Sequence, residues 1–428
     1  MRRRDRTKKL TIGTKLGIAT AIIAGIILTI FITYVMTIKN KVEQWNNKMY
    51  PGVIVNDINL SGKTKEEATE LLNTNFSNII TDKNLIVKSN GEEIKINYNE
   101  LNPHYNIDEV VNEAFNYGKS ENLFAKNDLI NQGAPKRYTL QFTYNEDKIK
   151  EYENQLASKV NRNPKNASIS INNGSISIKN DAYGIKINED EMTKLIKANI
   201  NGNLEKEDTT IEIPTEEVAP KVTKDMLTKI DGIISTFTSS FAHNSQPGRD
   251  KNLYAATKYV NGTLILPGEV FSYNETVGER TKARGFDYGG IMIGDKIEDG
   301  LGGGICQVST ALYRAVMRAG IKSVERHNHS MQTSYSPLGL DATVAWGSLD
   351  YKFKNTYDFP IYIEGYITKD KNIVFNVYGN KEAMGGKTYE LYAQANPNNS
   401  KEIRSYLVTY QNGIEIKREN IATDVYKK

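Results

Sequence analysis

Residues 300–320 read GLGGGICQVSTALYRAVMRAG, a run of glycines followed by a regular apolar pattern. Three consecutive glycines at 302–304 are unfavourable inside a helix or a strand, so they predict a loop. Apolar residues then recur at helical spacing over 305–319, and Gly320 is a suitable residue to end a helix. The stretch therefore predicts a helix that emerges from a flexible loop and carries Cys306 in its first turn.

The position of Cys306 favours reactivity. A helix N-terminus holds partial positive charge and unpaired backbone N–H groups, which favour a thiolate over a thiol. The same N–H groups, with those of Gly303 and Gly304, can hold an oxyanion during acyl transfer, and the side chain of Gln307 is a further candidate donor. Cys306 is the only cysteine of the chain. The plainer alternative is a buried, unreactive thiol, which is the commonest fate of a free cysteine.

Two histidines follow at a spacing that suits a catalytic base. A strand leaving Gly320 rises about 3.3 Å per residue and returns to the level of Cys306 after roughly six to eight residues, where His327 and His329 stand. Because they are two residues apart, both would share one strand face, and alternation does not choose between them. Asp341 follows as a candidate carboxylate to orient the base. A zinc site is the weaker alternative, and we expect no metal and no other cofactor.

The N-terminal region predicts a membrane anchor. Residues 16–38 contain no charged side chain and are long enough to cross a hydrocarbon layer of about 30 Å. The apolar run ends in large residues rather than in the small residues of a cleavage site, so we interpret it as an uncleaved signal anchor. Residues 1–15 carry seven basic residues and one acidic residue, which predicts a cytoplasmic N-terminus and an external remainder.

The rest of the chain predicts a soluble, folded α+β protein without a nucleic-acid partner. The net charge of +4 less the +6 of the first 15 residues leaves −2, which gives no basic surface for nucleic acid. Helical patterns alternate with short strand patterns before the cysteine region, and the tail alternates like a hairpin. The expected parts are two small α+β units at 50–130 and 131–218, a mixed α/β domain at 230–379 and a β-hairpin tail at 387–428.

Ordered sequence blocks between about residues 236 and 379 resemble a known family. The blocks are Phe237-Thr238-Ser239-Ser240-Phe241, Arg249 with Asn252, PGEVFS at 267–272, GGICQVSTALY at 303–313, Arg326, His329-Ser330, Asp341-Ala342-Thr343, and Asp350 with Lys354-Asn355. Together they resemble the VanW family, named for an accessory protein of vancomycin-resistance clusters. The preceding region, about 50–218, resembles the peptidoglycan-binding domains that often precede VanW domains.

The resemblance implies a chemistry for these residues. Some clostridial VanW-domain proteins are associated with L,D-transpeptidation, which forms 3→3 links between diaminopimelate residues of neighbouring peptidoglycan stem peptides. By resemblance, Cys306 is the acylated nucleophile. His329 is the favoured base because it lies in the family's His-Ser block, and His327 is the alternative. Arg249 and Arg326 are candidates to bind substrate carboxylates, since arginine binds them bidentately.

We therefore expect a single-pass membrane protein whose catalytic domain faces the cell wall and acts on stem peptides as an L,D-transpeptidase. With water as the acceptor, the same residues would make a cysteine peptidase or amidase. With an idle cysteine, the chain would be a peptidoglycan-binding accessory protein of glycopeptide-resistance type. The sequence does not choose among these three.

Overall fold

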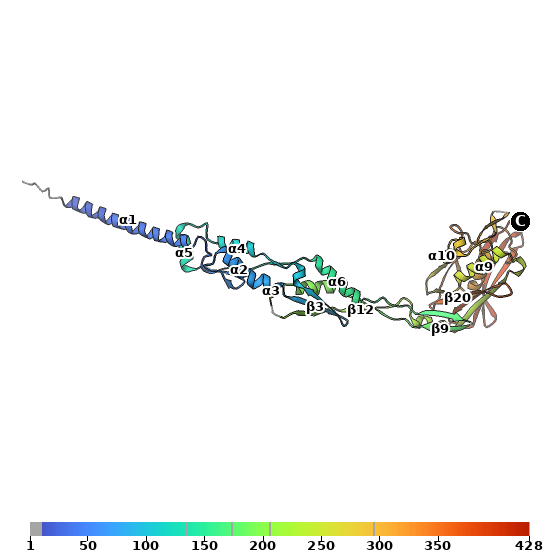
Figure 1. Ribbon diagram of the computed structural model, residues 1–428. Helices are drawn as coiled ribbons and strands as arrows, with labels where there is room; N and C mark the ends of the chain where they lie inside the picture. Colours follow the sequence, from blue (N-terminus) through green and yellow to red (C-terminus); the bar gives the residue numbers. More distant parts are fainter. Residues whose placement is uncertain (1–10, 134, 173, 205–206, 294–295, 428) are drawn as a thin grey trace, which may run out of the picture. The chain divides into compact units, whose positions relative to one another are not determined.

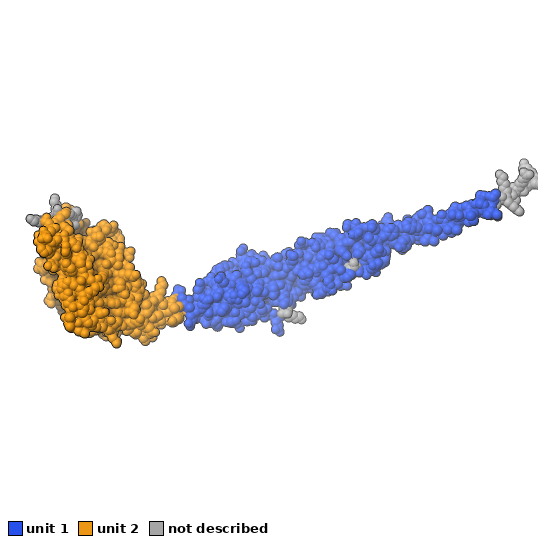
Figure 2. All heavy atoms as spheres, turned by 180° about the vertical axis from the view of Figure 1, so that it is seen from behind, with its two compact units in different colours: residues 1–163, 185–218 blue, residues 164–184, 219–428 orange. Residues whose placement is uncertain are grey.

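The computed structural model describes residues 11–133, 135–172, 174–204, 207–293 and 296–427. The predicted mixed α and β composition is confirmed, with an apolar N-terminal helix, many small sheets and a β-rich C-terminal region (Figure 1). The chain divides into two compact units (Figure 2). Unit 1 comprises residues 1–163 and 185–218, and unit 2 comprises residues 164–184 and 219–428.

Helix α1 (Ile12–Gln44) is the one helix in the described part of the chain that is long and apolar enough to cross a membrane. By length and composition it is either a membrane anchor or a signal sequence. It continues past the predicted apolar segment because Ile38 and Val42 are buried beside Tyr50 and Ile130. Of the predicted cytoplasmic tail, residues 1–10 lie outside the described residues.

Unit 1 alternates short helices and strands. Its helices after α1 are α2 (Lys65–Leu72), the π-helical η1 (Asn73–Ser77), α3 (Asn78–Ile80), the 3-10 helix η2 (Tyr98–Leu101), α4 (Ile107–Asn116), α5 (Leu123–Gln132), α6 (Asp147–Val160) and α7 (Glu189–Asn199). Its strands are β1 (Val53–Val55), β2 (Ile58–Asn59), β3 (Asn84–Ser89), β4 (Glu92–Asn97), β5 (His104–Tyr105), β6 (Lys136–Tyr138), β7 (Phe142–Thr143), β10 (Gly184–Ile187), β11 (Thr209–Glu212) and β12 (Thr215–Val218).

One hydrophobic core runs through unit 1. Strand β1 pairs with β6, and β3 pairs with β11, both in parallel, so strands from early and late parts of the segment share sheets. Most buried residues of unit 1, from Met49 to Ile213, belong to one cluster. Strands from both predicted units, 50–130 and 131–218, share sheets and one core. The division between these two units therefore stays a prediction.

Unit 2 contains the cysteine. Its helices are α8 (Lys224–Leu227), η3 (Ala242–Asn244), α9 (Pro247–Val260), α10 (Tyr273–Val277), η4 (Lys282–Arg284) and α11 (Cys306–Arg318). Its strands are β8 (Ser168–Asn172), β9 (Ser175–Lys179), β13 (Gly232–Ser240), β14 (Thr263–Ile265), β15 (Val270–Ser272), β16 (Tyr288–Ile293), β17 (Lys296–Leu301), β18 (Ser323–Glu325), β19 (Lys352–Lys354), β20 (Ile361–Ile367), β21 (Asn372–Gly379), β22 (Lys387–Asn396), β23 (Asn399–Gln411) and β24 (Ile414–Val425).

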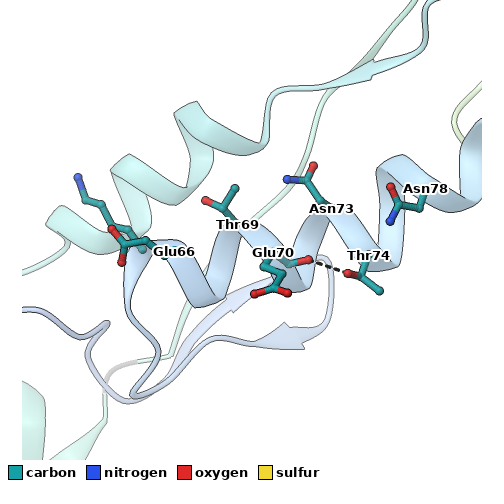
Figure 3. Close-up of a pocket in the computed structure, with 7 residues that line it drawn as sticks. Glu66, Thr69, Glu70, Asn73, Thr74 and Asn78 are labelled. Carbon is teal, nitrogen blue, oxygen red and sulfur yellow. Dashed lines mark hydrogen bonds between the residues drawn. The ribbon is translucent and has the colours of Figure 1, made fainter.

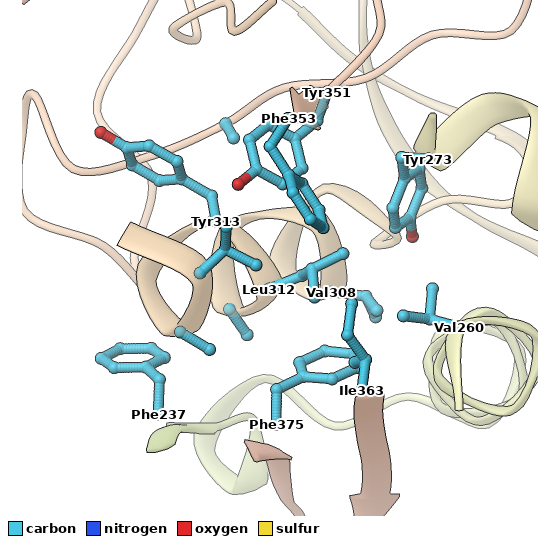
Figure 4. Packing of buried hydrophobic residues seen from close by; sticks show 14 of the residues in the cluster. Phe237, Val260, Tyr273, Val308, Leu312, Tyr313, Tyr351, Phe353, Ile363 and Phe375 are labelled. Atoms are coloured by element: carbon cyan, nitrogen blue, oxygen red, sulfur yellow. The ribbon is translucent and has the colours of Figure 1, made fainter. Parts of the chain in front are cut away.

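A four-stranded antiparallel sheet in the order β13-β21-β20-β14 supports helix α11. Alternate strand residues such as Ile363 and Phe375 face the main core, while Tyr362 and Tyr378 belong to a second cluster on the other face. Figure 4 shows Val308 and Leu312 of α11 among these side chains. Because α11 is buried along most of its length, it is a rigid support for the residue at its start.

The C-terminal region differs from the predicted two-stranded hairpin. Strands β22, β23 and β24 form a three-stranded antiparallel sheet. Leu391 and Leu407 of this sheet are buried in the main core of unit 2. The third strand was missed because most of β24 is exposed and lacks a clear apolar alternation. The sheet is an integral part of unit 2.

Candidate active site

The loop before α11 requires glycine at three consecutive positions. Gly302 and Gly304 have φ angles of +78° and +99°, a region that side chains rarely adopt. A Cβ on Gly303 would lie 2.2 Å from the backbone of Gly289. The buried Asn252 side chain donates to the Gly303 carbonyl oxygen at 2.9 Å. The predicted glycine loop is therefore a tightly packed turn with one fixed shape.

Cys306 is the first residue of α11 and is partly exposed. Its Sγ lies 3.5 Å from both Thr343 Oγ1 and the carbonyl oxygen of Val344. Only the neutral thiol can donate to the Val344 carbonyl, whereas the Thr343 hydroxyl can donate to a thiolate. Within the described residues, the backbone N–H groups of Gly304 and Cys306 have no acceptor. Two unpaired donors therefore stand at the start of the helix, beside the sulfur.

Buried hydroxyl groups of α11 hold the chain segment that carries Asp341. Ser309 Oγ donates to the carbonyl oxygen of Ala342 at 2.7 Å. The Ala342 N–H in turn donates to Thr310 Oγ1 at 3.0 Å. Buried hydrogen-bonding groups are rarely left without partners, so these bonds fix the register of the segment against the first turns of the helix.

His329 and Asp341 form a close buried pair. His329 Nδ1 lies 2.6 Å from Asp341 Oδ2, and the His329 backbone N–H donates to the same oxygen at 2.7 Å. Since Nδ1 faces the carboxylate, Nε2 is the ring nitrogen left for other partners. Nε2 lies 3.2 Å from Tyr335 Oη, and the imidazole also makes a side-chain hydrogen bond with Cys306. The structure thus brings the predicted cysteine, histidine and carboxylate together.

The electrostatics of this trio favour an ion pair. Burial opposes ionisation of the thiol, but the hydrogen bond and positive charge of His329 bring the pKa of Cys306 below its ordinary value. Burial alone would lower the pKa of His329, but Asp341 and Cys306 raise it to about 9. Burial would likewise raise the pKa of Asp341, which hydrogen bonds from His329 and Tyr426 hold below its usual range. The electrostatics therefore favour a thiolate on Cys306 beside an imidazolium on His329 and a carboxylate on Asp341.

His327 lies outside this cluster. Strand β18 ends at Glu325, so the predicted continuous strand over 321–330, which put both histidines on one face, was wrong. The His327 carbonyl oxygen accepts from the Thr343 N–H at 2.8 Å, while its ring Nε2 lies 3.1 Å from Glu325 Oε1. The geometry therefore distinguishes the two histidines, and only His329 contacts the cysteine and the carboxylate.

Gln307 is a structural residue, contrary to the expectation that it donates to an oxyanion. Its side-chain nitrogen donates to Ser239 Oγ and to the Ser240 carbonyl oxygen, both at 2.9 Å. Its side-chain oxygen accepts from Arg249 Nη2 at 2.6 Å. With both amide groups engaged and the residue buried, Gln307 anchors α11 to β13.

Arg249 is buried against the glycine loop. A Cβ on Gly304 would lie 2.7 Å from Arg249 Cγ. The Nη1 atom of Arg249 is buried and has no hydrogen-bond partner within the described part of the chain. Burial lowers the pKa of Arg249 from its usual value, yet a guanidinium remains charged at neutral pH. Its charge therefore lies next to the loop from which the unpaired N–H groups come.

Arg326 does not have the free guanidinium expected of a substrate ligand. Its Nη1 donates to both carboxylate oxygens of Asp424, at 2.7 and 2.5 Å. Its Nε donates to the Asp341 carbonyl oxygen at 2.6 Å, and its side chain is only 7% exposed. Internal carboxylates already occupy the guanidinium, and its predicted role in binding a substrate carboxylate stays a prediction.

Sequence reasoning missed Tyr335, Tyr426 and the supporting Asn252 as parts of the site. Asn252 and Tyr426 lie far from Cys306 along the chain, and no local pattern distinguishes these two tyrosines from the other 23. Asn252 did stand in one of the quoted sequence blocks, which was the available signal. Among the described residues, no group of three or more histidine, cysteine, aspartate or glutamate side chains could hold a metal ion.

A shallow polar depression lies on unit 1. It is formed along α2, η1 and the start of α3, and Figure 3 shows the side chains that line it. They are Lys65, Glu66, Thr69, Glu70, Asn73, Thr74 and Asn78. Its lining contains no cysteine or histidine, whereas Cys306, His329 and Asp341 lie in unit 2.

Comparisons with known proteins agree with this division. A family model described as "VanW like protein" matches residues 248–378, and one described as "Putative peptidoglycan binding domain" matches residues 94–209. "Uncharacterized protein YoaR" of Bacillus subtilis (strain 168) is 34% identical over 217 residues, which cover 51% of this chain and 70% of that protein. "Vancomycin B-type resistance protein VanW" of Enterococcus faecalis (strain ATCC 700802 / V583) is 27% identical over 173 residues, which cover 39% of this chain and 62% of that protein. No solved structure matches the chain.

Proposed function

This chain belongs to the VanW family, and from that premise we propose that it is a membrane-anchored L,D-transpeptidase that forms 3→3 peptidoglycan cross-links through a Cys306 acyl-enzyme. One observation carries the proposal, namely the contact of a partly exposed cysteine with a buried histidine–aspartate pair. A nucleophile, a base and a group that orients the base are what covalent acyl transfer requires.

The domain order supports a substrate in the cell wall. The VanW domain follows a domain of the peptidoglycan-binding family, and α1 precedes both. In the proposal α1 is an uncleaved anchor with its N-terminus in the cytoplasm, so that unit 2 faces the wall. The name of the Enterococcus relative connects that protein with vancomycin resistance.

In the first half-reaction, Cys306 Sγ attacks the carbonyl carbon of the L,D amide bond of a donor stem peptide. The developing oxyanion is held by the unpaired N–H groups of Gly304 and Cys306, with the charge of Arg249 nearby. The carbon–nitrogen bond then breaks, and His329 Nε2 gives its proton to the leaving amine. A thioester on Cys306 and a free D-amino acid result.

In the second half-reaction, the amine of an acceptor stem peptide attacks the thioester. His329, now neutral, accepts the proton of that amine, and the thiolate of Cys306 leaves. Asp341 keeps Nδ1 protonated and stabilises the imidazolium each time it forms. The new amide bond is the cross-link, and the enzyme returns to its starting ion pair.

Muropeptide composition tests the proposal. We expect cells that produce the wild-type chain to contain 3→3 dimers that are lost with Cys306→Ala, because the substitution removes the nucleophile. Incubation of the purified full-length protein with a tetrapeptide donor should add the mass of the acyl group to Cys306, measured by mass spectrometry.

Two other outcomes would replace the proposal. Shortened stems that depend on Cys306, without dimers, would make the protein a cysteine peptidase or amidase. Identical muropeptides in wild-type and Cys306→Ala cells, without acylation of the purified protein, would make it a binding protein. An immunoblot showing equal amounts of both forms is the necessary control.

A further inference from the structure

A tyrosine from the C-terminal region reaches the catalytic carboxylate. Tyr426 Oη donates to Asp341 Oδ1 at 2.5 Å and accepts from the Gly339 N–H at 2.7 Å. Tyr426 and Asp341 are 3% and 2% exposed, so water does not replace these bonds. Tyr426 lies just after strand β24, beyond residues 248–378 that match the family model.

The surrounding residues hold this contact in place. Asp424 binds Arg326, which in turn donates to the Asp341 carbonyl oxygen. The Lys427 N–H donates to the Ser330 carbonyl oxygen at 2.7 Å. Residues 424–427 are thus hydrogen-bonded to the residues on both sides of the His329–Asp341 pair.

The two carboxylate oxygens of Asp341 accept hydrogen bonds from different partners. Oδ2 accepts from the ring and from the backbone N–H of His329. Oδ1 accepts from Tyr426 at 2.5 Å and from Arg326 Nη2 at the longer distance of 3.3 Å. The tyrosine hydroxyl is therefore the closest donor to Oδ1, and it fixes the rotation of the carboxylate that directs Oδ2 at the imidazole.

We propose that Tyr426 is a positioning residue for the reaction, which orients Asp341 toward His329 and makes the C-terminal sheet part of the catalytic unit. The inference rests on the proposed role of the Cys306–His329–Asp341 trio. Without the hydroxyl, a buried carboxylate oxygen loses its shortest hydrogen bond. Asp341 then stabilises the imidazolium less, and the imidazolium stabilises the thiolate less. The hydrogen bond from Tyr426 is among the causes that keep the pKa of Asp341 low, after burial and the bond from His329.

The pH dependence of thiol alkylation tests this proposal without any peptidoglycan. Cys306 is the only cysteine, so iodoacetamide incorporation into the full-length protein in detergent reports on it alone. We expect Tyr426→Phe to move the midpoint of the rate–pH curve upward by about one pH unit, because a hydrogen bond to a charged group is lost. Tyr410→Phe is the matched control, since the Tyr410 hydroxyl forms a hydrogen bond with Tyr392 on the same sheet.

A second variant keeps the shape of the side chain. Replacing Tyr426 with 3-fluorotyrosine keeps the hydroxyl beside Asp341 Oδ1 and should leave the midpoint near the wild-type value, because positioning requires only that hydrogen bond. A midpoint equal to wild type in Tyr426→Phe, with thermal unfolding showing folded protein, would overturn the proposal. An equal upward shift in Tyr410→Phe would also overturn it, because the effect would then belong to the sheet in general. The wild-type protein could show the expected rate–pH curve for alkylation while cells that produce it contain no 3→3 dimers. That result would reject the proposed function and leave this inference intact.

Discussion

The proton shared by Cys306 and His329 determines when the site is ready to react. In the ion-pair form, the thiolate is the nucleophile and the imidazolium is the acid that the leaving amine needs. The buried Asp341 stabilises the imidazolium, and this favours the ion pair over the neutral form. In the proposed mechanism, this ion pair supplies the nucleophile without a further base.

We expect a bell-shaped pH profile for cross-linking and a single rise for alkylation. The alkylation rate of Cys306 should rise with pH through a midpoint below 9.0, the ordinary value for the thiol, because its pKa is lowered. Cross-linking should fall again above a pH of about 9, where His329 loses the proton that the leaving amine requires. Mass spectrometry of alkylated protein and of released muropeptides measures both. An alkylation midpoint at or above the ordinary thiol value would contradict the ion pair.

Two matched histidine variants separate the neighbouring rings. His329→Gln should move the alkylation midpoint toward the ordinary thiol value and lower cross-linking at least about 100-fold, since an acid–base group is removed. His327→Gln should leave both unchanged, because its ring faces Glu325. If His327→Gln lowers cross-linking and shifts the alkylation midpoint while His329→Gln changes neither, His327 is the base.

Single residues were predictable from sequence where their chemistry depends on local position. The place of Cys306 at a helix start follows from the neighbouring glycines and the apolar spacing alone. The internal partners of Gln307 and Arg326 were not predicted, because Ser239 and Asp424 lie 68 and 98 positions away. The contacts of such residues are set by tertiary packing, which spacing in the sequence does not contain.

The glycine loop and helix α11 act together as one element. The loop packs against the backbone of Gly289, and the helix behind it is buried in the core of unit 2. Any added atom in the loop must displace either a backbone segment or the helix. The loop is therefore a fixed turn that holds its N–H groups in one arrangement, which transition-state stabilisation requires.

Gly303→Ala should disturb this element strongly. The new Cβ would lie 2.2 Å from the Gly289 backbone, and we expect a loss of about 1–3 kcal/mol in the free energy of unfolding together with most of the activity. Denaturant unfolding and thiol alkylation measure the two effects. Gly232→Ala is the control, because its Cβ would meet the nearest atom at an ordinary 3.6 Å. Equal behaviour of the two variants would show that the turn tolerates a side chain.

Elements with strong internal patterns were predicted well from sequence, and elements defined by pairing were not. The helical pattern at the cysteine matches α11 closely because apolar periodicity is a local property. The strand after Gly320 was predicted too long, since β18 ends where the His327 carbonyl pairs with Thr343 instead of continuing a ladder. Strand β24 was not predicted, because its pairing with β23 defines it more than its own sequence pattern does.

The whole chain combines an apolar helix with two units that have separate cores. The core of unit 1 is built from residues between Met49 and Ile213, and the main core of unit 2 surrounds α11. Each unit therefore has enough buried apolar surface to support its own fold. Cys306, His329 and Asp341 all belong to unit 2, and the proposed function assigns contact with the wall to unit 1 and contact with the membrane to α1.

We expect α1 to remain on the mature protein and to hold it in the membrane. The full-length chain should stay in carbonate-washed membranes, and protease added outside intact spheroplasts should digest it. Ile27→Arg, at the centre of the apolar stretch, should weaken retention, because a central arginine costs about 2.5–3.5 kcal/mol. Ile12→Arg, at the start of the helix, serves as the control. A shortened, released protein without α1 would make the helix a cleaved signal sequence.

The contact between Tyr426 and Asp341 has a consequence for biogenesis. A ribosome makes Cys306 well before it makes the residue that fixes the carboxylate, and secretion delivers the two in the same order. Under the proposed function, the hydrogen bond that positions Asp341 is absent during that interval. Bond formation by the chain would then begin only after the C-terminal sheet has folded.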